Sequence, residues 1–190
     1  MPPENELRTW TCQIGDFTYT VSTDPRLVQL DEINAAFALD MVYWAKPLPL
    51  QQLRRCVENC LCFGLYFQEG GDMQRREEEE AAGQNNQKMI GLARLVTDYV
   101  TFGYLTDVYV LPEHQGKGLG RWMMECLGEV LDSWPDLRRC VLFTRGAGAV
   151  KLYRETIGAK DLSETPSASL IIMERPRATV KVEGKEEEVR

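Results

Sequence analysis

The spacing of hydrophobic residues divides the first third of the chain into a strand and two helices. Residues 17–22 alternate and are rich in β-branched side chains, which predicts a strand. After Asp24 and Pro25, apolar side chains recur at spacings of three and four as far as Ala38, which predicts a helix. The stretch 43–49, with two prolines, interrupts this pattern, and a second helix is expected from about residue 50 to residue 59.

Three strands are expected in the middle of the chain, at residues 61–67, 89–96 and 102–111, and a turn around Asp98 separates the last two. The stretch between the first two strands, residues 68–88, is polar and acidic and includes four consecutive glutamates, Glu77 to Glu80. This composition cannot bury enough apolar surface to order itself, so we expect a disordered hairpin loop there.

The last third of the chain predicts a helix at about 119–134, a strand at 140–143, a helix at 147–156 and a final strand at 170–173. Residues 176–190 are expected to form a charged tail. Strands and helices are mixed without repeated βαβ units, which predicts an α+β fold. A length of 190 residues favours one domain, which we place at residues 1–175.

Composition and charge limit the partners and the compartment. The net charge of −7 argues against nucleic acid as a partner, because nucleic acid requires a basic face. No stretch approaches the roughly 20 apolar residues of a membrane helix, and the segment from Met1 to Tyr19 lacks a signal-peptide pattern. We therefore expect no membrane partner and a cytoplasmic location, with the nucleus as an alternative. Cys56, Cys60 and Cys62 match no zinc-ligand spacing, so free thiols and no bound metal are expected.

A glycine-rich loop, Gln115-Gly116-Lys117-Gly118-Leu119-Gly120, connects a predicted strand to a predicted helix. Unpaired N–H groups and the helix dipole make such a position an anion site, and glycine allows close approach of the phosphate oxygens. A Walker A loop is excluded because Lys117 precedes Gly118 and no Ser or Thr follows. A dinucleotide fingerprint would need glycine where the chain has Arg121. A simple helix-capping turn remains the alternative.

In this loop Gln115, Gly118 and Gly120 match the Q/R-x-x-G-x-G/A motif, so the chain resembles the GNAT acyltransferase superfamily. Three further stretches resemble a widespread GNAT subgroup: residues 43–45 (YWA), 91–98 (GLARLVTD) and 104–110 (YLTDVYV). The resemblance spans about residues 17–173. It implies the GNAT fold, a central mixed and mostly antiparallel twisted sheet that is flanked by helices and splayed between its fourth and fifth strands.

The resemblance also implies a cosubstrate, acetyl-CoA. The backbone beside the splay would hold the pantetheine arm, although core packing is the alternative role for these side chains. The glycine loop would hold the diphosphate. The cofactor-binding residues so implied are Val108, Tyr109, Val110, Gln115, Gly116, Lys117, Gly118, Leu119, Gly120 and Arg121.

Tyr153 occupies the position of the tyrosine that the family uses to protonate the departing thiolate, and an ordinary amphipathic tyrosine is the alternative. Asp107 is the candidate base, with a structural hydrogen bond at a strand bulge as the alternative. Several GNAT enzymes have an acid where this chain has Thr106. His114 is expected at the surface or beside the phosphates. The candidate acceptor-binding residues are Trp44, Asp98, Tyr104 and Thr106; Asp98 is alternatively a turn aspartate and Trp44 a core anchor.

The function implied by the resemblance is N-acetylation of a primary amine, on a small molecule, by direct attack on acetyl-CoA. One alternative is acetylation of a protein lysine or N-terminus, in which case the acceptor is a peptide amine. The other alternative is a catalytically weak acyl-CoA-binding sensor. Either a monomer or a homodimer is compatible with the family.

Overall fold

The computed structural model describes residues 6–68, 87–164 and 173. The chain separates into two compact units, Met1–Ala159 and Lys160–Arg190. The described part of the second unit includes a short 3-10 helix, η4 (Leu162–Glu164). All the elements considered below belong to the first unit.

Six strands form one sheet in which each strand pairs with its neighbours in the chain. Pairing is antiparallel from the first strand to the fifth, and the sixth is parallel to the fifth. The strands are β1 (Thr9–Ile14), β2 (Phe17–Ser22), β3 (Leu61–Gln68), β4 (Lys88–Thr97), β5 (Phe102–Val110) and β6 (Arg139–Leu142).

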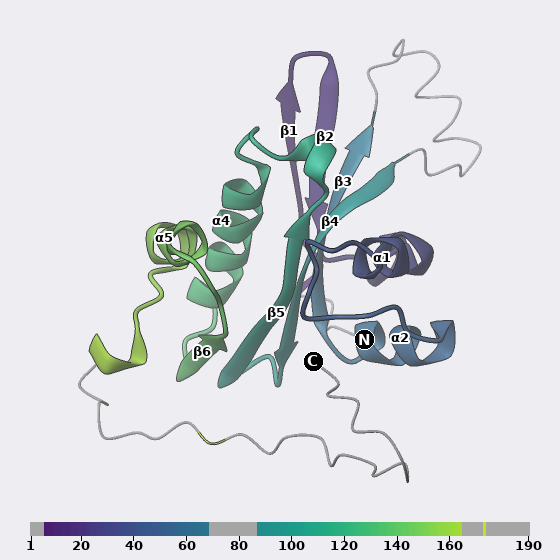
Figure 1. Ribbon diagram of the computed structural model, residues 1–190. Helices are drawn as coiled ribbons and strands as arrows, with labels where there is room; N and C mark the ends of the chain where they lie inside the picture. The colour runs from purple at the N-terminus through teal and green to yellow at the C-terminus, as the bar shows by residue number, and fades with distance from the viewer. Residues whose placement is uncertain (1–5, 69–86, 165–172, 174–190) are drawn as a thin grey trace, which may run out of the picture. The chain divides into compact units, whose positions relative to one another are not determined.

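Helices cover both faces of this sheet. Figure 1 shows α1 and α2 on one side and α4 and α5 on the other. The helices are α1 (Leu30–Phe37), α2 (Leu50–Glu58), α4 (Leu119–Asp132) and α5 (Ala147–Ile157), together with the short 3-10 helices η2 (Pro25–Leu27) and η3 (Pro112–His114). None of the helices in the described part of the chain has the length and apolar composition needed to cross a membrane.

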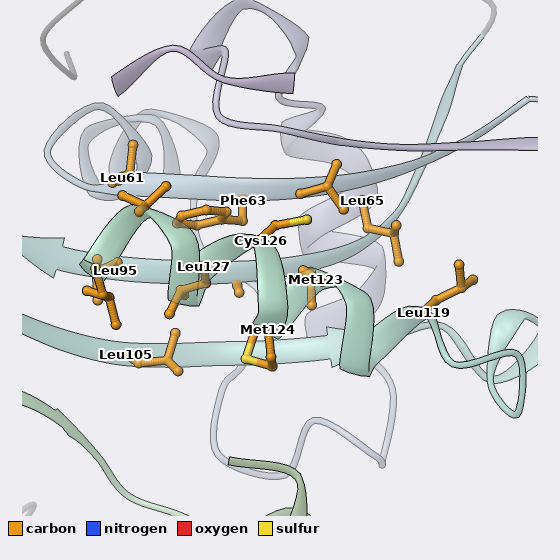
Figure 2. Close-up of a cluster of buried hydrophobic side chains, with 14 of the residues drawn as sticks. Leu61, Phe63, Leu65, Leu95, Leu105, Leu119, Met123, Met124, Cys126 and Leu127 are labelled. Atoms are coloured by element: carbon orange, nitrogen blue, oxygen red, sulfur yellow. The ribbon is translucent and has the colours of Figure 1, made fainter. Parts of the chain in front are cut away.

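The sheet separates two hydrophobic cores. The first lies between α4 and strands β3, β4 and β5, where the apolar face of α4 meets buried strand residues (Figure 2). The second lies beneath α1 and α2 and includes Ile33, Leu53 and Tyr66. Because β3 is buried on both faces, its sequence is an almost continuous apolar run. The face to which a β5 side chain points therefore decides which of the two cores it joins.

Most of the predicted elements are confirmed, within a few residues at their ends. Two expectations are wrong. Strand β1 was not predicted, and the helix expected from Asp24 to Ala38 is divided, because Val28 has extended backbone angles (φ −66°, ψ 126°) between η2 and α1. Most of the acidic loop, most of the final strand and the charged tail lie outside the described residues, so the limits of the domain stay a prediction.

Candidate active site

A bulge in β5 changes the face to which its side chains point. The register with β4 shifts between Leu92 and Arg94, and Asp107, on β5 opposite this shift, has φ of 51°. Aspartate tolerates this left-handed conformation better than most residues. As a result Leu105 joins the core beneath α4, whereas Tyr109 joins the core beneath α1 and α2. A regular strand would direct both side chains to one face.

Beyond this bulge β5 separates from β6. The two strands pair only along Phe102–Leu105, although β5 continues to Val110 and pairs there with β4. Along residues 106–110 the other edge of β5 has no partner strand among the residues that the structure describes. The splay predicted between the fourth and fifth expected strands is therefore confirmed; the additional strand β1 makes these two strands β5 and β6. An open strand edge offers N–H and C=O groups to an extended ligand.

The glycine-rich loop follows β5 and η3 and leads into α4. Gly116 (φ 76°) and Gly118 (φ 79°) both have left-handed backbones, and a Cβ added to either would meet no atom within 4 Å. The first helical hydrogen bond runs from the Trp122 N–H to the Gly118 carbonyl. Within the described residues, the N–H groups of residues 116–121 donate no hydrogen bond. They form an open cradle at a helix N-terminus, suited to a diphosphate.

The polar side chains of this loop contact the protein rather than pointing freely into the cradle. The Gln115 amide donates to the Val110 carbonyl at 2.8 Å. The Lys117 ammonium donates to the Glu113 carbonyl at 3.3 Å and to the Tyr19 hydroxyl at 3.4 Å.

Arg121 likewise contacts acidic side chains: it forms an ion pair with Glu155 of α5, and its Nη1 lies 3.7 Å from Glu125 Oε1. In this loop the main-chain N–H groups, more than the side chains, are thus available to bind a ligand.

Tyr153 lies on α5, the helix that follows β6, and packs against the core beneath α4. Its side chain is half-buried, and burial raises the pKa of the phenol above its ordinary value. Among the described residues its hydroxyl has no hydrogen-bond partner. The phenol therefore stays protonated at neutral pH and is free to donate.

On the opposite face of the sheet a pocket of about 390 Å³ lies between the α1–α2 connection, α1, α2, β4 and β5. Four predicted site residues line it together: Trp44, Tyr104, Thr106 and Asp107. The floor is apolar, and its lining includes Ile33, Phe37, Leu48, Leu53, Val57 and Leu92.

A half-buried ion pair between Arg94 and Asp107 lines this pocket. Arg94 Nη2 lies 2.6 Å from Asp107 Oδ2, and Arg94 Nε donates to the same oxygen at 2.7 Å. Trp44 Nε1 donates to Asp107 Oδ1 at 3.3 Å. Burial alone would lower the pKa of Arg94, but the Asp107 charge and hydrogen bonds to Cys60 and Asp107 outweigh it, so the pKa is raised. These contacts favour the structural role for Asp107.

Arg94 was not among the predicted site residues. The signal was present, since Arg94 is the one charged residue within an otherwise apolar predicted strand, residues 89–96. A charge in a buried strand requires a partner, and such partners cluster at functional sites. The sequence does not reveal the β5 bulge, which brings Asp107 to the same face of the sheet as Arg94.

The family model described as "Acetyltransferase (GNAT) family" matches residues 50–159, more than half of the chain. The chain belongs to the GNAT acetyltransferase family. It is therefore an acyltransferase, and the predicted membership of the GNAT superfamily is confirmed.

Individual GNAT relatives cover most of the chain. It is 44% identical over 174 residues to the acetyltransferase homologue FG08082 of Gibberella zeae. The match covers 90% of this chain and 95% of that protein. A GNAT-family protein of Xanthomonas campestris pv. campestris has a solved structure with a TM-score of 0.57 and 30% identity, and the match covers 83% of this chain and 94% of that one.

A shorter match, 28% identical over 106 residues, joins the chain to "GCN5-related N-acetyltransferase 2, chloroplastic" of Arabidopsis thaliana. It covers 54% of this chain and 41% of that protein. None of these three names specifies an acceptor.

Asp98 is the predicted acceptor residue that the GNAT fold does not bring to the pocket. Its carboxylate lies in the β4–β5 turn and accepts hydrogen bonds from the backbone N–H groups of Val100, Thr101 and Phe102 and from the Thr101 hydroxyl. These hydrogen bonds lower the pKa of Asp98, those from Thr101 most. This is the turn role that the sequence analysis offered as its alternative.

His114 lies beside the glycine-rich loop, where its ring packs against Phe67 and Tyr19 at centroid distances of 4.7 and 6.1 Å. Burial, and secondarily the Lys117 charge, lower its pKa. Its Nδ1 is buried without a hydrogen-bond partner in the described part of the chain.

The six cysteines are free thiols. Within residues 6–68, 87–164 and 173, no group of three or more His, Cys, Asp and Glu side chains is placed to hold a metal.

Proposed function

We propose that this GNAT acyltransferase transfers an acetyl group from acetyl-CoA to a primary amine of a small molecule by direct attack. One observation carries the proposal: the β5 bulge joins two sites. Residues 106–107 line the pocket on one face, and the unpaired edge of β5 begins at the same residues. A donor in the open edge and an acceptor in the pocket would meet at this point.

The donor side of the proposal depends on main-chain groups. The open N–H groups of residues 116–121 would bind the diphosphate, and the edge formed by Val108, Tyr109 and Val110 would pair with the pantetheine arm. Gln115 and Arg121 lie close by, held by Val110 and Glu155. Acetyl-CoA, when bound, supplies the thioester that the amine attacks.

The protonation chemistry is proposed for Tyr153. Its phenol, kept protonated by its raised pKa, would donate a proton to the departing sulfur. The amine must lose a proton in turn. A carboxylate whose oxygens already accept from Arg94 and Trp44 is a poor base, so we propose that Asp107 holds the bulge and Trp44 in place while water accepts the proton.

The size of the pocket supports a small molecule rather than a protein as the acceptor. A pocket of about 390 Å³ bounded by α1, α2 and their connection is large enough for a small amine. Trp44, Tyr104 and Thr106 would line the bound amine.

The test is an assay of thiol release from acetyl-CoA across a library of amines, with CoA affinity measured in parallel. Tyr153→Phe should lower kcat about 100-fold and leave the Kd for CoA unchanged, because it removes only the proton donor. Tyr99→Phe is a matched control: burial also raises the pKa of Tyr99, to about 12, but it lies in the β4–β5 turn. If the protein binds CoA but no amine accelerates thiol release, the enzyme proposal fails and the sensor alternative is favoured.

A further inference from the structure

The charge of the acceptor pocket is opposite in sign to that of the chain as a whole. The chain carries a net charge of −7. The pocket has three charged lining residues, Lys46, Arg94 and Asp107, so two cations face one carboxylate. A ligand in the pocket therefore meets a local field that the overall composition does not predict.

The single carboxylate of the pocket is already neutralised. Asp107 Oδ2 accepts from Arg94 at 2.6 and 2.7 Å, and Asp107 Oδ1 accepts from Trp44 at 3.3 Å. The side chain of Asp107 is 9% exposed. A cationic ligand would have to compete with Arg94 for these oxygens, so the pocket offers little to a second ammonium group.

Lys46 supplies the remaining charge, and it stands on a fixed backbone. The N–H of the preceding Ala45 donates to the Val42 carbonyl at 3.2 Å. Two residues after Lys46, both backbone groups of Leu48 bond to the Asn34 amide, at 2.7 and 3.0 Å. Among the described residues the Lys46 ammonium has neither an ion pair nor a hydrogen bond. It is exposed at the pocket and available to a ligand.

A second cation lies near the same connection. The Arg145 guanidinium stacks over the Tyr43 ring at 5.0 Å from the centroid, next to Trp44. No acidic side chain within the described residues pairs with Arg145. Arg145 thus adds a positive charge beside the α1–α2 connection.

We propose that the acceptor carries a carboxylate in addition to its nucleophilic amine, joined by an apolar portion, and that Lys46 binds this carboxylate. The proposal rests on the proposed acetyl transfer and names the substrate class of that site. The amine end would lie at Thr106 beside the β5 bulge, the apolar portion against the pocket floor, and the anionic end at Lys46. Polyamines are disfavoured because a further ammonium group would face Lys46, and because the Asp107 carboxylate is already paired with Arg94.

The test uses three acceptors that share one chain length and one terminal amine but differ at the far end: aminohexanoate (anionic), aminohexanamide (neutral) and diaminohexane (cationic). We expect kcat/KM, measured by thiol release, to fall in that order by about tenfold at each step, equivalent to about 1.4 kcal/mol per step. Lys46→Glu should reverse the order, and Lys46→Met should bring the ratio of anionic to neutral acceptor close to one.

Lys88→Glu is the matched control. Lys88 is also an exposed lysine, 58% accessible, but it lies at the start of β4 beside Glu32 and does not line the pocket. This variant changes the net charge as Lys46→Glu does and should keep the wild-type order. A wild-type enzyme that prefers diaminohexane, or a preference for aminohexanoate that survives in Lys46→Glu, overturns the proposal while acetyl transfer stands.

Binding without turnover separates this proposal from the proposed function. The same three amines are titrated calorimetrically into the protein saturated with CoA. Tighter binding of aminohexanoate, lost in Lys46→Glu, supports the carboxylate site even if no acetyl group is transferred and the proposed function fails. Equal binding of all three amines, or binding of none, overturns the carboxylate site.

Discussion

The two sides of β5 are built from different parts of the chain. On the side proposed to bind the cofactor, one continuous segment, residues 116–121, presents its own main-chain N–H groups. On the side proposed to bind the acceptor, side chains that are distant in sequence converge; Trp44 and Asp107, which share a hydrogen bond, are 63 positions apart. A site made of main-chain groups is specified locally, whereas a site made of side chains depends on how strands pair and where they bulge.

The largest effect is expected from a change in the local, main-chain site. Gly118→Ala places a Cβ in the open space of the cradle and strains a backbone with φ of 79°. We expect the Kd for CoA to rise about 100-fold, because two or more hydrogen bonds to a charged ligand are lost or lengthened. Calorimetric titration of CoA measures this change.

Gly15→Ala is the control for strain alone. Gly15, in the β1–β2 turn, has φ of 61° and equally open surroundings. Both variants should lose about 1 kcal/mol of unfolding free energy, the cost of a left-handed backbone for alanine. Only Gly118→Ala should lose CoA affinity. Equal CoA affinities in the two variants would place the diphosphate elsewhere.

This contrast also explains which parts of the site the sequence could predict. The loop, its helix and the splayed fold follow from a short motif and from hydrophobic spacing, and they were predicted. Tyr104 and Thr106 were placed in the acceptor site because they alternate on one strand face, and both line the pocket.

What the sequence could not supply was long-range register. Asp107 reaches the pocket beside Thr106, its neighbour in the strand, only because of the bulge, which local pattern does not reveal. The Arg94 pair required the same information. Strand β1 escaped prediction although it pairs with β2 along its whole length. Its exposed residues alternate weakly with half-buried ones, as expected of an edge strand.

A second prediction tests whether the side-chain site is held together by its ion pair. Asp107→Asn keeps a residue that tolerates the left-handed backbone but leaves Arg94 without its counter-charge. We expect the unfolding free energy to fall by about 2 kcal/mol, between the values for exposed and fully buried pairs. Urea denaturation measures this loss. Asp24→Asn, which weakens the exposed pair with Arg26, should cost no more than about 0.5 kcal/mol.

The same variant distinguishes the two roles of Asp107. If the carboxylate is structural, Asp107→Asn should chiefly raise the KM for the amine, since Trp44 and the pocket wall lose their anchor. If turnover instead slows by about two orders of magnitude at unchanged stability, Asp107 is the base.

The smallest effect concerns His114 and sharpens the comparison from the cofactor side. Burial and the Lys117 charge hold the folded pKa of His114 below its ordinary value of about 6.5. As pH falls through that value, the unfolded chain takes up a proton that the folded chain does not. The contribution of His114 to the unfolding free energy is therefore highest above about pH 6.5 and decreases toward about pH 5.

His114→Phe keeps a ring against Phe67 and cannot titrate. The difference in unfolding free energy between this variant and the wild type, measured by urea denaturation, should therefore shift in favour of the variant as the pH falls from about 7 to about 5. Screening by solvent limits this shift to about 0.5 kcal/mol. Saturating CoA should reduce it, because a diphosphate on residues 116–121 stabilises a nearby imidazolium. An acceptor amine alone should leave it unchanged, since the pocket lies on the other face of the sheet. If CoA leaves this pH-dependent difference in unfolding free energy unchanged, the diphosphate does not lie next to His114.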